Sequence, residues 1–164
     1  MKLIDCDQYV YWFRQLGNED VVGDIMWAHP NSIKLLNSFP TVLICDTTYK
    51  TNKYHLPLLE IIGITSTRMI FVVAFAYLSF ERMNYFEWAL SKLKGSFVKD
   101  NVLSQVIISD RDLALMNALE IMFPCSTKLL CLFHITNNVS TKCKVIMDNG
   151  EEWQNIMDAW ELLL

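Results

Sequence analysis

The stretch Thr41-Val42-Leu43-Ile44-Cys45-Asp46 decides the fold, because five apolar or β-branched residues lead directly to a carboxylate. A continuous run of this kind predicts a β-strand that is buried on both faces, as in the centre of an α/β sheet. The same arrangement occurs at Gln105-Val106-Ile107-Ile108-Ser109-Asp110. The two segments therefore predict two buried strands, each with an aspartate at its C-terminal end.

The residues between these two segments predict antiparallel pairing followed by a helical crossover. Leu58–Ile64 and Ile70–Tyr77 are apolar strands joined by a short polar turn, so the first three strands should form an antiparallel meander. Residues 81–97 have the apolar spacing of an amphipathic helix. A right-handed crossover through this helix would place the fourth strand parallel to the first and beside it.

The rest of the chain completes a mixed α/β order in three regions. Residues 1–20 predict a helical lead-in, because Leu3–Leu16 has amphipathic spacing and a polar turn follows it. Residues 21–147 should form the main domain, a mixed five-stranded sheet with three antiparallel strands, further parallel strands and flanking helices. Its fifth strand is expected at Lys128–Phe133. Residues 148–164 predict the start of a helical insertion or tail.

Composition favours an intracellular globular domain. Hydrophobic residues make up 52% of the chain and charged residues 20%, and the longest apolar stretch is shorter than the roughly 20 residues of a membrane-spanning helix. Five cysteines at irregular spacing argue against a disulfide framework and fit a reducing compartment. A net charge of −4 opposes strong binding to a phosphate backbone. Any grip on DNA should come mainly from segments outside this chain, and no membrane partner is expected.

The two aspartates form a candidate metal site. If their strands are neighbours, about 4.8 Å apart, Asp46 and Asp110 could hold the same cation. Ligation by oxygen alone suits Mg²⁺ or Mn²⁺, which in phosphodiester chemistry activate the attacking hydroxyl and stabilise the leaving oxygen. The alternative is that both aspartates only end strands or cap helices, positions where aspartate is common.

Four motifs follow one another along the chain. They are Asp46-Thr47-Thr48-Tyr49-Lys50-Thr51-Asn52, Leu56-Pro57-Leu58-Leu59-Glu60, Asp110-Arg111-Asp112-Leu113-Ala114-Leu115-Met116-Asn117-Ala118 and Cys131-Leu132-Phe133-His134. In this order they resemble the MULE transposase domain of Mutator-like transposases and of the plant far-red impaired response regulators derived from them. The resemblance covers about residues 21–144. It implies an RNase H-like fold, a nuclear location, and metal-dependent DNA cleavage and strand transfer, with Asp46 and Asp110 as the first two acids of a DDE triad.

The resemblance also implies a third acid, a glutamate well beyond the C-x-x-H element. The acids downstream of that element are better explained as a solvated helical face, so we expect the third acid to be missing and the chain to be inactive. These acids are Asp148, Glu151, Glu152 and Glu161. Glu87, on the crossover helix, could approach the site, although a surface position is the simpler explanation. Asp112 matches the family motif but is expected to cap a helix.

Cys131 and His134 match the C-x-x-H element of the family. A structural zinc ion takes four ligands, and these two residues supply only half of them even though Cys143 could be a third. A buried cysteine in a strand and a polar histidine at its end explain the same residues. We therefore do not expect zinc.

Three functions remain compatible with the sequence. The first is a transposase-derived domain, incomplete and inactive in this chain, and the second is a DNA-associated transcription regulator of the far-red impaired response type. The third is a decayed transposon product. Apolar residues near Trp160–Leu164 suggest a surface for a partner, for which a second copy of the chain is one candidate.

Overall fold

The computed structural model describes residues 8–15, 21–48, 52–98, 104–144 and 150–162, which include seven strands and five helices. The strands are β1 (Val10–Gln15), β2 (Val22–Ala28), β3 (Val42–Thr48), β4 (Leu58–Ile64), β5 (Ile70–Tyr77), β6 (Val106–Ser109) and β7 (Thr127–Leu130). The helices are α2 (Pro30–Ser38), α3 (Met83–Lys94), α4 (Leu113–Met122), α5 (Leu132–Lys144) and α6 (Gly150–Glu161).

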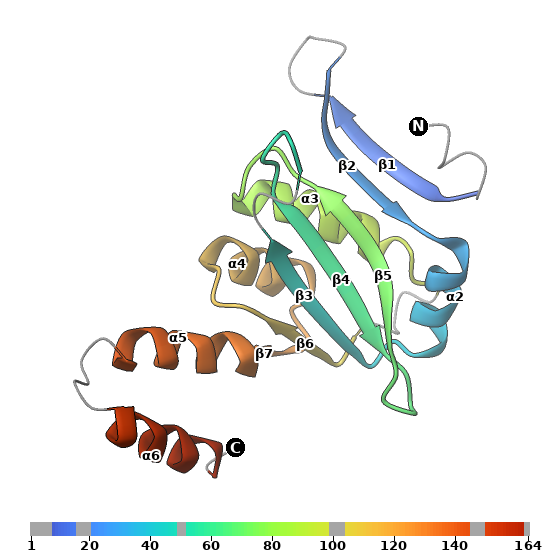
Figure 1. Cartoon of the computed structure of the whole chain (residues 1–164). Coiled ribbons are helices and arrows are strands. Elements are labelled where there is room, and N and C mark those ends of the chain that lie inside the picture. Colours follow the sequence, from blue (N-terminus) through green and yellow to red (C-terminus); the bar gives the residue numbers. More distant parts are fainter. Residues whose placement is uncertain (1–7, 16–20, 49–51, 99–103, 145–149, 163–164) are drawn as a thin grey trace. The chain divides into compact units, whose positions relative to one another are not determined.

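The strands form one mixed sheet in the order β1-β2-β5-β4-β3-β6-β7 (Figure 1). Strands β3, β4 and β5 make the predicted antiparallel meander. Strand β6 returns through α3 and pairs with β3 in parallel, with Val42 opposite Val106 and Cys45 opposite Ser109. The α/β class and the central strand order predicted from the sequence are therefore confirmed.

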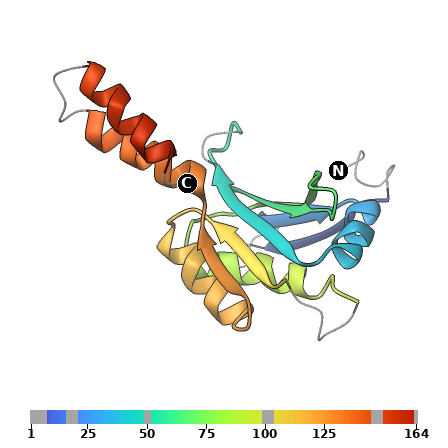
Figure 2. The ribbon, with the colours of Figure 1, turned by 90° about the horizontal axis from the view of Figure 1, so that it is seen from below.

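The core lies between the sheet and the helices α3 and α4, which lie against the same face (Figure 2). Alternate residues of β3 point to this face, and Leu43 and Cys45 are buried there. The matching face of α3 carries the fully buried Phe86 and Leu90. Because alternate residues of β3 face the core, the residues between them must point to the opposite face of the sheet.

The N-terminal helix predicted at Leu3–Leu16 is wrong where the structure describes it. Residues Val10–Gln15 form the edge strand β1, which pairs with β2, with Tyr11 opposite Trp27. Aromatic and β-branched side chains pack well on a pleated surface, and the edge of β2 supplies the backbone partners that a helix would have made internally. The described part of the lead-in thus contributes a strand to the sheet, and with β1 and β2 the sheet has seven strands where five were expected.

The chain divides into two compact units, Met1–Leu129 and Leu130–Leu164, a boundary earlier than the predicted end of the main domain at residue 147. The second unit consists mainly of α5 and α6, where the indole Nε1 of Trp160 donates a hydrogen bond of 3.2 Å to Thr136 Oγ1.

Strand β7 is shorter than the predicted Lys128–Phe133, since α5 already begins at Leu132. None of the helices that the structure describes is long and apolar enough to cross a bilayer.

Gly63 provides a test of the meander. It lies opposite Phe71, and a Cβ at residue 63 would come within 2.3 Å of Cζ of that ring. Because Phe71 packs against the core, Gly63→Ala should destabilise the chain by about 1–3 kcal/mol in urea denaturation. Gly95→Ala is the control, since its nearest neighbour would be 3.5 Å away. Equal stability of the two variants would contradict this packing.

Candidate metal centre

Asp46 lies inside β3, two residues before the strand ends at Thr48, and not at its last position as the sequence suggested. It is half-buried and directly opposite Glu60 of β4. The backbone N–H of Thr47 donates a hydrogen bond of 3.0 Å to Asp46 Oδ1. Its neighbour Cys45 points into the core, so the Asp46 carboxylate points to the sheet face away from α3 and α4.

Asp110 follows the last residue of β6, as predicted, and is also half-buried. Its Oδ1 accepts a hydrogen bond of 3.2 Å from the backbone N–H of Asp112. Asp112 in turn caps α4, because its Oδ1 accepts a bond of 2.7 Å from Leu115 N. The capping role predicted for Asp112 is confirmed, and the tight turn between β6 and α4 fixes where the Asp110 carboxylate lies.

The parallel pairing of β3 with β6 brings the two aspartates together. A carboxylate oxygen of Asp46 and one of Asp110 lie within 4.8 Å of one another. Burial, together with the charge of Asp46, raises the pKa of the Cys45 thiol to about 12, so this sulfur stays protonated at neutral pH. The ligands that the strands offer here are therefore oxygens, which fits Mg²⁺ or Mn²⁺ and does not fit a thiolate site.

Glu81 is a further carboxyl group, within electrostatic reach of Asp112 and Asp110, and no sequence pattern singled it out. It lies between β5 and α3, and its Oε1 is shielded from solvent with no hydrogen-bond partner among the described residues. Burial, followed by the charges of Asp112 and Asp110, raises the pKa of Glu81 to about 7. The sequence placed this residue at the start of a helix. It raised Glu87 as a carboxylate that could approach the site, with a surface position as the simpler explanation. Only the tertiary structure shows the burial.

Cys131 and His134 belong to the second unit. Cys131 precedes α5 and His134 lies in its first turn, so the element starts a helix and does not lie at the end of a strand as expected. No group of three metal-binding side chains among the described residues contains Cys131 or Cys143.

Of the downstream acids, Glu152 is exposed on α6, while Asp148 and the side chains of Glu151 and Glu161 lie outside the described part.

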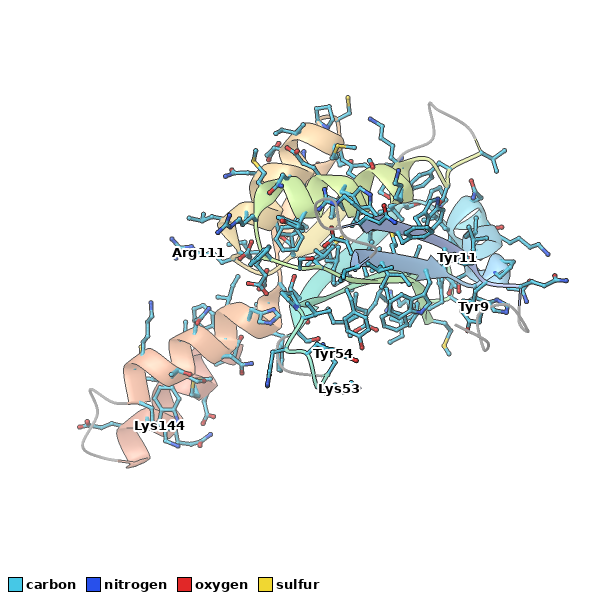
Figure 3. The ribbon with its side chains drawn as sticks, turned by 90° about the horizontal axis from the view of Figure 1, so that it is seen from above. Tyr9, Tyr11, Lys53, Tyr54, Arg111 and Lys144 are labelled. Atoms are coloured by element: carbon cyan, nitrogen blue, oxygen red, sulfur yellow. The ribbon has the colours of Figure 1, made fainter. Side chains whose placement is uncertain are left out.

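Basic side chains lie in the turns that follow β3 and β6 (Figure 3). Lys53, in the loop after β3, places its Nζ 4.7 Å from the centre of the Tyr54 ring. Arg111 is exposed and directly follows Asp110. Lys53 comes from the loop after β3, and Arg111 from the turn that begins at Asp110.

The pKa of Glu81 predicts how stability depends on pH. Between the ordinary pKa of 4.5 and the folded value of about 7, the folded chain holds a proton that the unfolded chain has lost. The contribution of Glu81 to stability is therefore complete below pH 4.5 and is lost as the pH rises through 7. In EDTA, Glu81→Gln should be more stable than the wild type at pH 8, with a smaller advantage at pH 5. Urea midpoints measure this, and an advantage independent of pH would contradict it.

Comparison with known proteins places this geometry in a family. The family model of the MULE transposase domain matches residues 42–138. Protein FAR1-RELATED SEQUENCE 5 of Arabidopsis thaliana is 24% identical over 87% of this chain and 18% of its own length. Protein FAR1-RELATED SEQUENCE 6 of the same plant is 25% identical over 80% of this chain and 18% of its own. A PKS-NRPS hybrid synthetase, cheA of Chaetomium globosum, is 26% identical over 77% of this chain and 3% of its own.

The chain thus spans less than a fifth of the length of these relatives. The match to the family model covers more than half of the chain, and it includes β3, β6 and both aspartates that their pairing brings together. The chain therefore belongs to the MULE transposase domain family.

Proposed function

We propose that this chain is a transposase-derived domain of RNase H-like fold in which Asp46 and Asp110 bind Mg²⁺ or Mn²⁺ for cleavage and strand transfer of DNA. The observation that carries the proposal is the approach of these two carboxylates, within 4.8 Å, inside the range that matches the family. A bound divalent cation would activate a hydroxyl for attack on a phosphodiester and stabilise the leaving oxygen.

The backbone around the two aspartates supports this function by fixing their carboxylates in advance. Asp46 is held within a paired strand and by the Thr47 N–H, and Asp110 by the Asp112 N–H. Like charges so close together repel each other, and a cation between them removes the repulsion. The site is therefore preorganised for a cation, with little conformational entropy left to lose on binding.

Strand transfer by this chain alone is not part of the proposal. The chemistry of the family uses a third acid downstream of the C-x-x-H element, and the acids in that part of the chain are better explained as a solvated helical face. The net charge of −4 also leaves most of the grip on DNA to other segments. We propose that the chain binds the cation and that transfer needs these further parts.

Calorimetric titration of Mn²⁺ into the chain tests the cation site. Asp46→Asn and Asp110→Asn should each lower the affinity about tenfold or more, because each removes a ligand and a charge but keeps the side-chain shape. Asp158→Asn, on the exposed face of α6, is the matched control and should bind as the wild type does. Absence of binding by the wild type, or unchanged affinity in both site variants, would overturn the proposal.

A second candidate is a nuclear, DNA-associated transcription regulator of the far-red impaired response type. It is favoured by the similarity to the two FAR1-related sequence proteins over 80% and 87% of this chain. In that function the fold would serve binding and assembly, and the cation chemistry would be dispensable. Chromatin occupancy of a tagged chain in the nucleus separates the two. If Asp46→Asn leaves occupancy and target expression unchanged, the regulator is favoured. If the wild type induces DNA breaks and Asp46→Asn abolishes them, the enzyme is favoured.

A further inference from the structure

We propose that the sheet holds unpaired bases of a DNA strand, stacked on an aromatic face beside the two aspartates. The aromatic face consists of Tyr11, Trp27, Phe75 and Tyr77, on the side of the sheet away from α3 and α4. This inference rests on the proposed function, from which it takes DNA as the ligand. It adds the form of that DNA, a strand whose bases are free close to the phosphodiester that is cut.

The first support is the register of the sheet. One row of directly paired residues runs from the edge strand β1 through β2, β5 and β4 to β3. Because directly paired residues point to the same face, the whole row lies on the face to which the Asp46 carboxylate points. In order from β1, the row is Tyr11, Trp27, Phe75, Glu60 and Asp46. Three aromatic side chains therefore lead across the sheet towards the candidate cation site.

The strand spacing sets the distance between these rings and the aspartates. Neighbouring strands lie about 4.8 Å apart, so Phe75 is roughly 10 Å and Trp27 roughly 14 Å from Asp46 along the row. Successive nucleotides of a stacked strand rise about 3.4 Å. A strand whose phosphodiester lies at the aspartates thus reaches the rings within a few nucleotides. The ligand on the rings and the ligand at the aspartates are then parts of one molecule.

The second support is the state of the rings. The centre of the Trp27 ring lies 5.6 Å from that of Phe75 and 5.4 Å from that of Tyr77. These three side chains are only half-buried, and Tyr11 at the edge is 39% exposed. Tryptophan is highly buried on average in folded proteins, whereas a base needs an accessible ring on which to stack. The aromatic face thus keeps surface that a base can contact.

A hollow borders the aromatic face. Its lining includes Tyr9, Trp27, His29 and Phe75. The rings of Tyr9 and His29 meet edge to face, with 5.1 Å between their centres. Figure 3 shows Tyr9 on the side of the sheet away from α3 and α4. A hollow between flat rings suits a flat base more than a bulky aliphatic side chain.

The third support is the charge of the chain. A net charge of −4 gives little attraction to phosphates, on which binding of duplex DNA mainly depends. Stacking uses the faces of the bases, and in a duplex these faces are already stacked on one another. Lys53, in the loop that leads into β4, adds an exposed cation on the same side of the sheet as Tyr9 (Figure 3). These features favour an unpaired strand over a duplex.

The test is binding of an oligothymidylate of about 16 nucleotides, measured by fluorescence anisotropy at low salt in EDTA. EDTA removes the cation, so the aromatic face is measured by itself. Trp27→Leu should weaken binding about tenfold or more, because it removes a stacking ring and keeps apolar bulk. Phe80→Leu is the matched control and should bind as the wild type does. Phe80 is 47% exposed and packs against Tyr85 of α3, outside the aromatic face.

Tryptophan fluorescence tests whether a base stacks on Trp27 itself. A base stacked on an indole quenches its fluorescence, and the difference between the wild type and Trp27→Phe isolates this residue among the five tryptophans. Trp27→Phe keeps a ring in the sheet, so it should retain the affinity and lose that part of the quenching. Tyr11→Thr, at an exposed strand position, should weaken binding about fivefold or more. Circular dichroism verifies that each variant is folded.

The outcomes separate this inference from the proposed function. Equal affinity for the oligothymidylate and for a duplex of the same length, or quenching that is unchanged in Trp27→Phe, would overturn the inference. So would a dimer in sedimentation that Tyr11→Thr dissociates and that binds no oligothymidylate, since a second copy would then cover the rings. Binding of Mn²⁺ without binding of the oligothymidylate overturns this inference alone. Binding of the oligothymidylate without Mn²⁺ overturns the proposed cation chemistry and leaves the aromatic face as a DNA surface.

Discussion

The parallel ladder between β3 and β6 is the constraint on which the rest of the first unit depends. It requires a crossover, which α3 provides, and the buried face of that helix fixes which side of β3 points to the core. Asp46 then has to point to the other side. The same ladder brings Asp110 to the neighbouring position, although a long stretch of chain separates the two residues. One set of backbone hydrogen bonds thus determines both the hydrophobic core and the approach of two charges.

The central strands could be predicted because their sequences leave few alternatives. The runs that became β3 and β6 are continuous and apolar, and β4 and β5 are connected by a short turn that allows only antiparallel pairing. The approach of the two aspartates could be predicted from these runs, because each aspartate comes directly after one of them in the sequence. The helix cap at Asp112 was also predictable, since it depends on the backbone of its own turn.

What the sequence could not show depends on contacts between distant segments. Residues Val10–Gln15 have a spacing that suits a helix, and only the edge of β2 makes them a strand. The burial of Glu81 results from the packing of the β5–α3 junction near the β6–α4 turn, which no local pattern records. Glu87 could be placed on a helix from the sequence, because helical spacing is visible without any tertiary information.

The ion pair between Arg14 and Asp24 has a consequence for anyone who shortens the chain. The range that matches the family begins at residue 42, so a fragment cut to that range would lack β1 and β2 and leave the edge of β5 open to other chains. A cut at residue 21 would keep Asp24 but remove Arg14, leaving a carboxylate that is 1% exposed without its guanidinium. The N-terminal strand is therefore an integral part of the folding unit, although the family motifs do not include it.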